Sequence, residues 1–131
     1  MIKEFSKAEI GKFGEDYCAK YLKRTRKCKI IAQNATIGHL EADVIAYDKE
    51  HILFVEVKTR SVNKNNYARP SAAVNRDKRT NLINFAYAFV KTLPQKLKEK
   101  SIRIDVCEIL VEEGKKLKVC DFNYIENAVT R

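Results

Sequence analysis

The sequence has no long apolar run, and no stretch approaches the roughly 20 apolar residues that a membrane-spanning helix needs. The first residues lead into a polar segment, whereas a secretory signal has an apolar core. Neither end of the chain carries an isolated basic amphipathic helix of the kind that binds membrane surfaces. We therefore expect a cytoplasmic protein with no membrane partner.

Cysteine pairs with metal-binding spacing are also absent. The cysteines lie far apart and form no Cys-x-x-Cys pair, which argues against a zinc site or a redox motif. Each lies in or beside an apolar run, as expected for reduced and mostly buried thiols. They are Cys18, Cys28, Cys107 and Cys120.

Acidic residues are outnumbered by basic ones. The 26 lysines and arginines against 17 aspartates and glutamates give a net charge of +9. In a small domain, such an excess points to a polyanionic partner, and nucleic acid fits better than a membrane. The chain has no internal repeat and no low-complexity tract, and its 131 residues predict one domain, residues 1–131.

The stretch from Leu40 to Arg60 carries the strongest chemical signals. Two arms rich in β-branched and aromatic residues flank a charged turn at residues 48–50, which predicts a β-hairpin. Alternation along the second arm places Glu56 and Lys58 on one face, and we expect the apolar face to be buried. The first face carries Ile52, Phe54, Glu56 and Lys58, and the second carries Leu53, Val55, Val57 and Thr59.

The register of this hairpin decides whether its carboxylates meet. If paired residue numbers sum to 99, Asp43 faces Glu56 and Glu41 faces Lys58, whereas a slip of one residue separates them. Two carboxylates at the edge of an apolar core repel each other. Protonation, a side-chain cation or a hard divalent metal relieves the repulsion. We expect a divalent metal here, because Lys58 supplies only one positive charge for two carboxylates.

A first helix is predicted by the capping box Ser6-Lys7-Ala8-Glu9 and by apolar residues at helical spacing. Gly11 and Gly14 interrupt its apolar stripe, which suggests a close approach of the backbone to the sheet or to a ligand. Glu15 lies at the margin of the stripe, where its carboxylate could lean over the end of the sheet. A solvated glutamate is an equally good interpretation.

The remaining elements predict an α/β fold with a mixed central sheet of four to five strands flanked by helices, in the order α-β-β-β-α-β. The second helix is a crossover that can place the following strand parallel to the hairpin's second strand. We expect a strand at 29–33, a turn at 34–39, a helix at 75–91, a charged linker at 95–100, a strand at 102–111, a turn at 112–115, an edge strand at 116–120 and at most a short helix at 123–131.

A basic segment leaves directly from Lys58. From Thr59 to Pro70 the chain is polar and contains no acidic residue, and long loops of this kind are often binding loops. We expect it to contact nucleic-acid phosphates, with a solvated charged loop as the alternative. The proposed phosphate-binding residues are Arg60, Lys64, Arg69, Arg76, Lys78 and Arg79.

An Asp followed one strand later by Glu-x-Lys is the arrangement that a metal-dependent phosphodiesterase needs. Asp43 and Glu56, with the backbone carbonyl of Val57, would hold Mg²⁺ through hard oxygen ligands. The metal would lower the pKa of a bound water, and Lys58 would orient that water or stabilise the developing charge. The alternative is a structural Glu56–Lys58 ion pair.

The order of motifs from Gly11 to Val106 resembles that of the YraN-like bacterial proteins. The matching stretches are Gly11-Lys12-Phe13-Gly14-Glu15, Gln33-Asn34, Leu40 to Ala46, Phe54 to Arg60, Pro70 to Val74 with Lys78, and Arg103-Ile104-Asp105-Val106. That family is similar to the archaeal Holliday junction resolvases and has the restriction-endonuclease-like fold. It usually has Gly-Glu-Ile-Asp where this chain has Leu40-Glu41-Ala42-Asp43, so both acids remain.

The resemblance implies a PD-(D/E)xK endonuclease with metal ligands at Asp43 and Glu56, a catalytic Lys58 and an additional helix carboxylate at Glu15. Glu41 is a further carboxylate that would support the ligands. We expect hydrolysis of DNA, branched DNA included, with Mg²⁺ as cofactor and Mn²⁺ as a substitute. A nucleic-acid-binding protein of the same fold without significant turnover is the alternative. A homodimer would suit two nicks in a symmetric junction.

Overall fold

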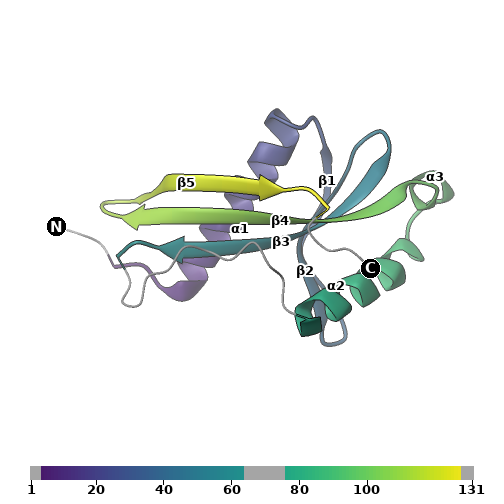
Figure 1. The fold of residues 1–131 in the computed structure, drawn as a ribbon, viewed down its shortest axis with the longest axis horizontal. Coiled ribbons are helices and arrows are strands. Elements are labelled where there is room, and N and C mark those ends of the chain that lie inside the picture. The colour runs from purple at the N-terminus through teal and green to yellow at the C-terminus, as the bar shows by residue number, and fades with distance from the viewer. Residues whose placement is uncertain (1–3, 64–75, 128–131) are drawn as a thin grey trace.

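The computed structural model describes residues 4–63 and 76–127 and is built around a five-stranded sheet (Figure 1). Strand order in the sheet follows chain order, and only the β3–β4 pair is parallel. The strands are β1 (Lys29–Ile37), β2 (Leu40–Tyr47), β3 (His51–Ser61), β4 (Ser101–Glu113) and β5 (Leu117–Ile125), and the helices are α1 (Lys7–Arg24), α2 (Arg76–Val90) and α3 (Gln95–Lys98). The predicted α/β class, the mixed sheet and the parallel crossover are confirmed.

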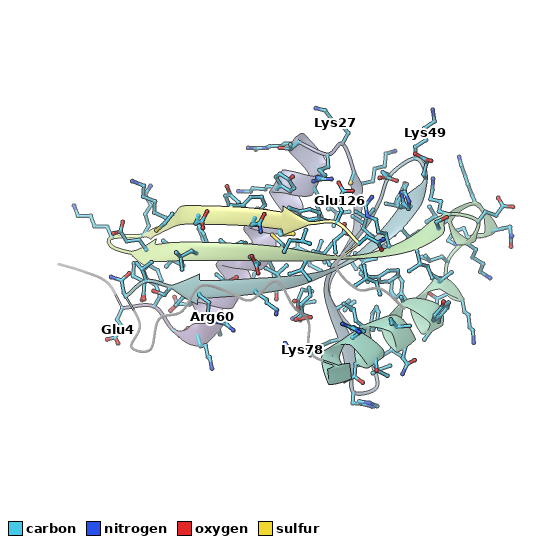
Figure 2. The ribbon with its side chains drawn as sticks, in the orientation of Figure 1. Glu4, Lys27, Lys49, Arg60, Lys78 and Glu126 are labelled. Atoms are coloured by element: carbon cyan, nitrogen blue, oxygen red, sulfur yellow. The ribbon has the colours of Figure 1, made fainter. Side chains whose placement is uncertain are left out.

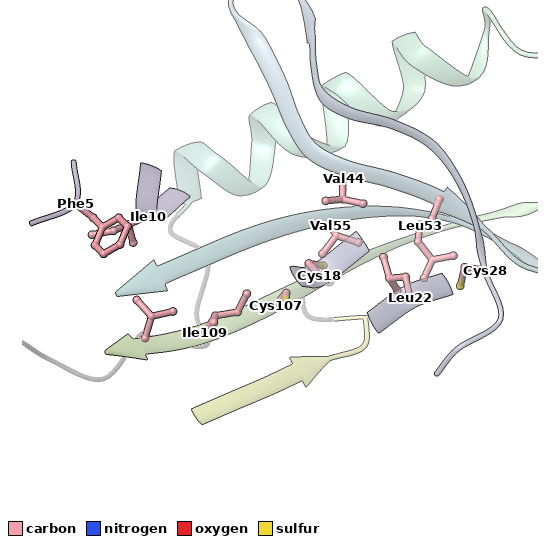
Figure 3. Close-up of a cluster of buried hydrophobic side chains, with 12 residues drawn as sticks. Phe5, Ile10, Cys18, Leu22, Cys28, Val44, Leu53, Val55, Cys107 and Ile109 are labelled. Atoms are coloured by element: carbon pink, nitrogen blue, oxygen red, sulfur yellow. The ribbon is translucent and has the colours of Figure 1, made fainter. Parts of the chain in front are cut away.

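Helices α1 and α2 cover opposite faces of the sheet, so the protein has two apolar cores. The α1 core contains Cys18 and Leu22 of the helix packed against Leu53 and Val55 of β3 (Figure 3). The α2 core contains Phe85 of the helix packed against Phe54. None of the helices in the described ranges is both long and apolar enough to cross a membrane.

Strand β3 is buried on both faces along its first half. Ile52, Leu53, Phe54 and Val55 are all 0% exposed. The predicted burial of the face that carries Leu53 and Val55 is confirmed, and Ile52 and Phe54 on the other face are buried as well, because a central strand covered by a helix on each side has no solvent face. After His51 at its start, β3 has no polar residue before Glu56, where this double coverage ends.

Three of the four cysteines are buried and all four are free thiols, as predicted.

The first helix also begins where the sequence indicated. The Ser6 hydroxyl accepts from the Glu9 amide at 3.0 Å, and the Glu9 carboxylate accepts from the Ser6 amide at 2.8 Å. Together these two bonds satisfy donors that the first turn of a helix leaves free.

Helix α1 crosses β3 at Gly14. A Cβ atom at this position would overlap the side chain of Thr59, whereas a Cβ at Gly11 would meet nothing within 4 Å. The predicted close approach to the sheet is thus confirmed at Gly14 and wrong at Gly11. A side chain at Gly14 would have to push the helix away from the sheet.

Gly14→Ala is expected to destabilise the protein by about 1–3 kcal/mol through overpacking. Gly11→Ala is the matched control in the same helix, and it is expected to stabilise the protein by up to about 1 kcal/mol, because alanine is the better helix former. Urea unfolding of both variants measures the difference. Equal effects of the two substitutions would show that the crossing at Gly14 can relax.

The N-terminal edge of the sheet is longer than predicted. Strand β1 continues through Ile37, so the expected turn at 34–39 shrinks to Gly38 and His39. Asn34 adopts φ 51° inside the strand, and the β1–β2 register shifts between Ile30 and Ala32. Asparagine tolerates this left-handed conformation, so pairing with β2 continues past the irregularity.

Two further expectations were wrong near the C-terminus. The linker at 95–100 contains α3, which begins directly after Pro94, and the edge strand runs through Ile125 where a helix was expected from residue 123. The long strand β4 offers pairing partners as far as Val106–Ile125, and Phe122 packs its ring against Tyr21 of α1. Residues 128–131 of the expected helix lie outside the described residues.

Asp105 on β4 is a fully buried carboxylate at the centre of a hydrogen-bond network. It accepts from Arg103 Nε at 3.0 Å, from the Tyr124 hydroxyl at 2.6 Å and from the Asn127 amide at 2.8 Å. Burial and the charge of Asp105 raise the pKa of Tyr124, which stays a neutral donor. The network attaches the end of β5 and the residues after it to the sheet.

Candidate functional site

The β2–β3 hairpin has the predicted register. Val44 pairs with Val55 and Ile45 with Phe54, so the numbers of paired residues sum to 99. Because side chains alternate, Asp43 shares a face with Ile45, and Glu56 shares the same face with Phe54. Both carboxylates therefore lie on the α2 side of the sheet, just beyond the last regular pair.

Asp43 bridges the place where this pairing ends. Its Oδ2 accepts from the Val57 amide at 2.8 Å, across the gap between the two strands. The N–H and C=O of a strand residue point to the same edge, so the Val57 carbonyl is directed toward β2 as well. The structure thereby brings together the three groups that the sequence proposed as metal ligands, namely the carboxylates of Asp43 and Glu56 and this carbonyl.

The carboxylates at this site destabilise one another's charge. Burial, and next the charge of Glu56, raise the pKa of Asp43 to about 7, and Glu15 and Glu41 contribute in the same direction. Burial likewise raises the pKa of Glu15, and among the nearby charges that act on it are Glu41 and Glu56. Lys12, its neighbour on α1, opposes this rise, so the effect on the pKa of Glu15 comes first from burial and only partly from the carboxylates of β2 and β3.

Lys58 lies on the same face of β3 and is flanked by Glu108, its neighbour on β4 in the parallel register. Burial and the charge of Lys78 lower the pKa of Lys58, while Glu56 and Glu108 oppose that change. Oxygen Oε2 of Glu108 is buried and has no hydrogen-bond partner among the described residues. The sequence did not reveal Glu108, because its place beside Lys58 depends on the β3–β4 register.

Lys78, in the first turn of α2, makes an ion pair with the site. Its Nζ lies 3.3 Å from Oε1 of Glu56. The sequence had placed Lys78 among the phosphate-binding residues. Because it pairs with Glu56, a proposed metal ligand, Lys78 is in direct contact with the site.

The other predicted residues are spread around this centre. Arg60 and Arg79 are exposed, and Figure 2 shows Arg60 and Lys78 along the same long side of the molecule. Glu41 pairs with Thr36 of β1, and the β2–β3 pairing ends before the expected Glu41–Lys58 pair. Lys64 and Arg69 lie outside the described residues, and Arg76 is described only as the first residue of α2.

A second set of contacts holds the start of the basic segment. Glu113 at the end of β4 accepts from the Ser61 hydroxyl at 2.5 Å and from the Phe5 amide at 3.1 Å. The Glu113 amide donates to the Asn63 side chain at 2.7 Å. These contacts hold Ser61 and Asn63 in place where the chain leaves β3. No local pattern could have predicted this, because the partners are distant in sequence.

The donor set fits a hard divalent cation. Within residues 4–63 and 76–127, no three His, Cys, Asp or Glu side chains form a ready-made metal cluster. The predicted set does not require one, because Mg²⁺ commonly binds through one or two carboxylates and keeps several waters. Burial and the charge of Glu56 raise the pKa of Asp43 to about 7. A cation bound to the two carboxylates would relieve the repulsion between them.

Fold and topology define an α/β domain in which helices flank a mixed five-stranded sheet. The chain belongs to the uncharacterised protein family UPF0102, the YraN family, whose profile matches residues 14–109. UPF0102 proteins from Dictyoglomus thermophilum and Syntrophomonas wolfei are 35% and 37% identical to it, in both cases over 92% of this chain and 96% of the relative.

A UPF0102 protein from Caldicellulosiruptor saccharolyticus is 37% identical over 94% of this chain and 98% of the relative. A similar solved structure is that of SfsA from Pyrococcus furiosus in complex with Ca²⁺. The two share 13% sequence identity with a TM-score of 0.46, and the match covers 85% of this chain and 63% of SfsA.

Proposed function

We propose that the protein is a metal-dependent nuclease that hydrolyses phosphodiester bonds in DNA. One observation supports this above the others. Asp43 and Glu56 share a face at the end of a buried strand pair, and burial and mutual repulsion raise the pKa of Asp43 to about 7. Lys58 stands on that same face of β3. A carboxylate pair and a lysine at one strand end are what metal-assisted phosphodiester hydrolysis requires.

In this proposal Asp43, Glu56 and the Val57 carbonyl would hold Mg²⁺, with Mn²⁺ as a substitute. The bound ion would supply charge stabilisation and an activated water. The Val57 amide fixes the orientation of Asp43 through its 2.8 Å hydrogen bond. Lys58 would orient the attacking water or stabilise charge on the phosphate oxygens, and Glu15 would add a carboxylate from α1.

DNA would be bound through its backbone phosphates. Arg60 and Arg79 are exposed beside the site, and the sequence adds Lys64, Arg69 and Arg76. Phosphate contacts of this kind carry no base specificity and weaken steeply as salt rises. We include branched DNA among the substrates, place the activity in the cytoplasm, and regard a homodimer as the form that would cut a symmetric junction.

The test is cleavage of linear and four-way branched DNA in Mg²⁺, in Mn²⁺ and in EDTA. We expect cleavage with either metal and none with EDTA. Lys58→Ala should lower the rate by about a hundredfold, the effect of removing one group that stabilises transition-state charge. Lys118→Ala, at an exposed position of β5, removes the same charge away from the site and should leave the rate unchanged.

Two outcomes would contradict the proposal. Cleavage by the Lys58→Ala variant at the wild-type rate would assign the activity to another site or to a contaminant. Salt-sensitive DNA binding without cleavage in any metal would instead identify a nucleic-acid-binding protein of the same fold.

A further inference from the structure

Lys78 and Glu56 form an ion pair that joins α2 to the end of β3. The Glu56 side chain is 16% exposed and the Lys78 side chain 56%, with 3.3 Å between Nζ and Oε1. The pair therefore links a largely buried carboxylate to a lysine that is more than half in solvent. The Lys78 side chain can therefore move away from Glu56 without exposing the apolar core.

Lys78 lies in the first turn of α2, which also carries the basic residues Arg76 and Arg79. It is the third residue of α2, and the first turn of a helix favours negative side chains because the helix dipole is positive there. A lysine at this position works against the dipole. The ion pair with Glu56 offsets the unfavourable interaction of Lys78 with the helix dipole.

One lysine does not relieve the whole repulsion at the site. Lys78 carries one positive charge, whereas Asp43 and Glu56 bring two negative charges to one face at the end of the β2–β3 pairing. A divalent cation carries twice the charge and prefers carboxylate oxygens. Partly exposed ion pairs contribute little to stability, so such an ion can replace the lysine at small cost.

We propose that Lys78 stands in for the metal ion. It neutralises Glu56 while the site is empty of metal, leaves that carboxylate when a divalent cation binds, and then contacts a substrate phosphate. This inference rests on the proposed function, because it requires Glu56 to be a metal ligand. Lys78 is thus a metal-responsive residue of the site, distinct from the surface arginines.

Calorimetric titration with Mn²⁺ in the absence of DNA tests the first half. The variant is Lys78→Met, which keeps the length of the side chain and removes the charge, and Arg79→Met is the control, because neighbouring helix residues face different directions. The salt concentration is about 0.15 M, where charges beyond about 8 Å are screened. We expect Lys78→Met to bind Mn²⁺ about two- to fivefold more tightly than wild type, and Arg79→Met to be unchanged.

DNA affinity tests the second half, in a Lys58→Ala background that suppresses cleavage. Fluorescence anisotropy compares binding in EDTA with binding in Ca²⁺, which takes oxygen ligands like those of Mg²⁺. We expect Lys78→Met to weaken binding mainly in Ca²⁺, where the ammonium is released. Arg79→Met should weaken binding by the same factor in both conditions.

The outcomes separate the two proposals. If wild type binds no Mn²⁺, the metal-dependent function fails and the inference fails with it. If Lys78→Met binds Mn²⁺ as wild type does, or more weakly, the inference is overturned and the nuclease proposal stands. Circular dichroism verifies that the variants are folded, and Lys78→Gln repeats the measurement if Lys78→Met is not.

Discussion

Asp43→Asn is expected to lower the rate of DNA cleavage on the order of a thousandfold or more, because it removes a charged ligand and with it most of the benefit of the metal. The same substitution should raise the stability of the metal-free protein at pH 8 by about 1–3 kcal/mol. Asparagine can still accept the hydrogen bond from Val57, so the contact at 2.8 Å is retained. Activity and stability should therefore move in opposite directions.

The pH dependence follows from the direction of the shift. The pKa of Asp43 is raised to about 7 in the folded protein, chiefly by burial and then by Glu56. A group with a raised pKa favours the folded state fully below its unfolded pKa, and this contribution is lost as pH rises through the folded value. The gain from Asp43→Asn should thus be largest above pH 7 and disappear near about pH 4, the usual range of an aspartate.

Urea unfolding at pH 8 and at pH 4, in EDTA, measures this difference. Asp16→Asn is the control, because hydrogen bonds from Lys12 and Gln33 outweigh the effect of burial and lower the pKa of Asp16. Its effect at pH 8 should have the opposite sign, a loss of stability. Saturating Mg²⁺ should stabilise wild type and leave the Asp43→Asn variant unchanged. A variant that loses stability at pH 8 would show that Asp43 is not under electrostatic strain.

Asp105→Ala is expected to destabilise the protein by about 3–5 kcal/mol, the usual result of removing one partner of a buried ion pair. Arg103, only 14% exposed, would lose its buried carboxylate partner and, among the described residues, keep only the 3.6 Å ion pair with Glu126. The Tyr124 hydroxyl and the Asn127 amide would lose their acceptor. The free energy of unfolding in urea is the measurement. A loss of this size is a large part of the stability of a small domain.

Glu112→Ala provides the comparison for that substitution. Glu112 lies on the same strand at an exposed position, so its removal should change stability by less than about 0.5 kcal/mol. Asp105→Asn keeps one acceptor oxygen and the side-chain shape, and its effect should fall between the two. Similar effects of Asp105→Ala and Glu112→Ala would mean that the network around Asp105 contributes little.

Local patterns predicted the parts of the site that one hairpin contains. The alternation around Glu56 and the charged turn at residues 48–50 were enough to set the register that places Asp43 and Glu56 on one face. The capping box and the apolar spacing likewise placed α1, and α2 was correct to within one residue at each end. In each case the deciding contacts are close together in the chain.

Contacts between distant segments could not be predicted in this way. The pairing of Lys78 with Glu56 depends on where α2 lies over the sheet, and the place of Glu108 beside Lys58 depends on the β3–β4 register. The extension of β5 to Ile125 required knowing that β4 is long enough to pair with it. These features depend on how whole helices and strands pack against one another, which a short stretch of sequence does not predict.

The crossing of α1 over β3 has a consequence for the precision of the site. Gly14 is adjacent to Glu15, and Thr59, which its Cβ would overlap, is adjacent to Lys58. The position of the α1 backbone relative to the end of β3 is therefore set by the packing of Gly14 against the Thr59 side chain. Sites built on rigid elements hold their groups more precisely than sites on loops. Gly14 thus determines how closely the helix that carries Glu15 approaches the strand that carries Glu56 and Lys58.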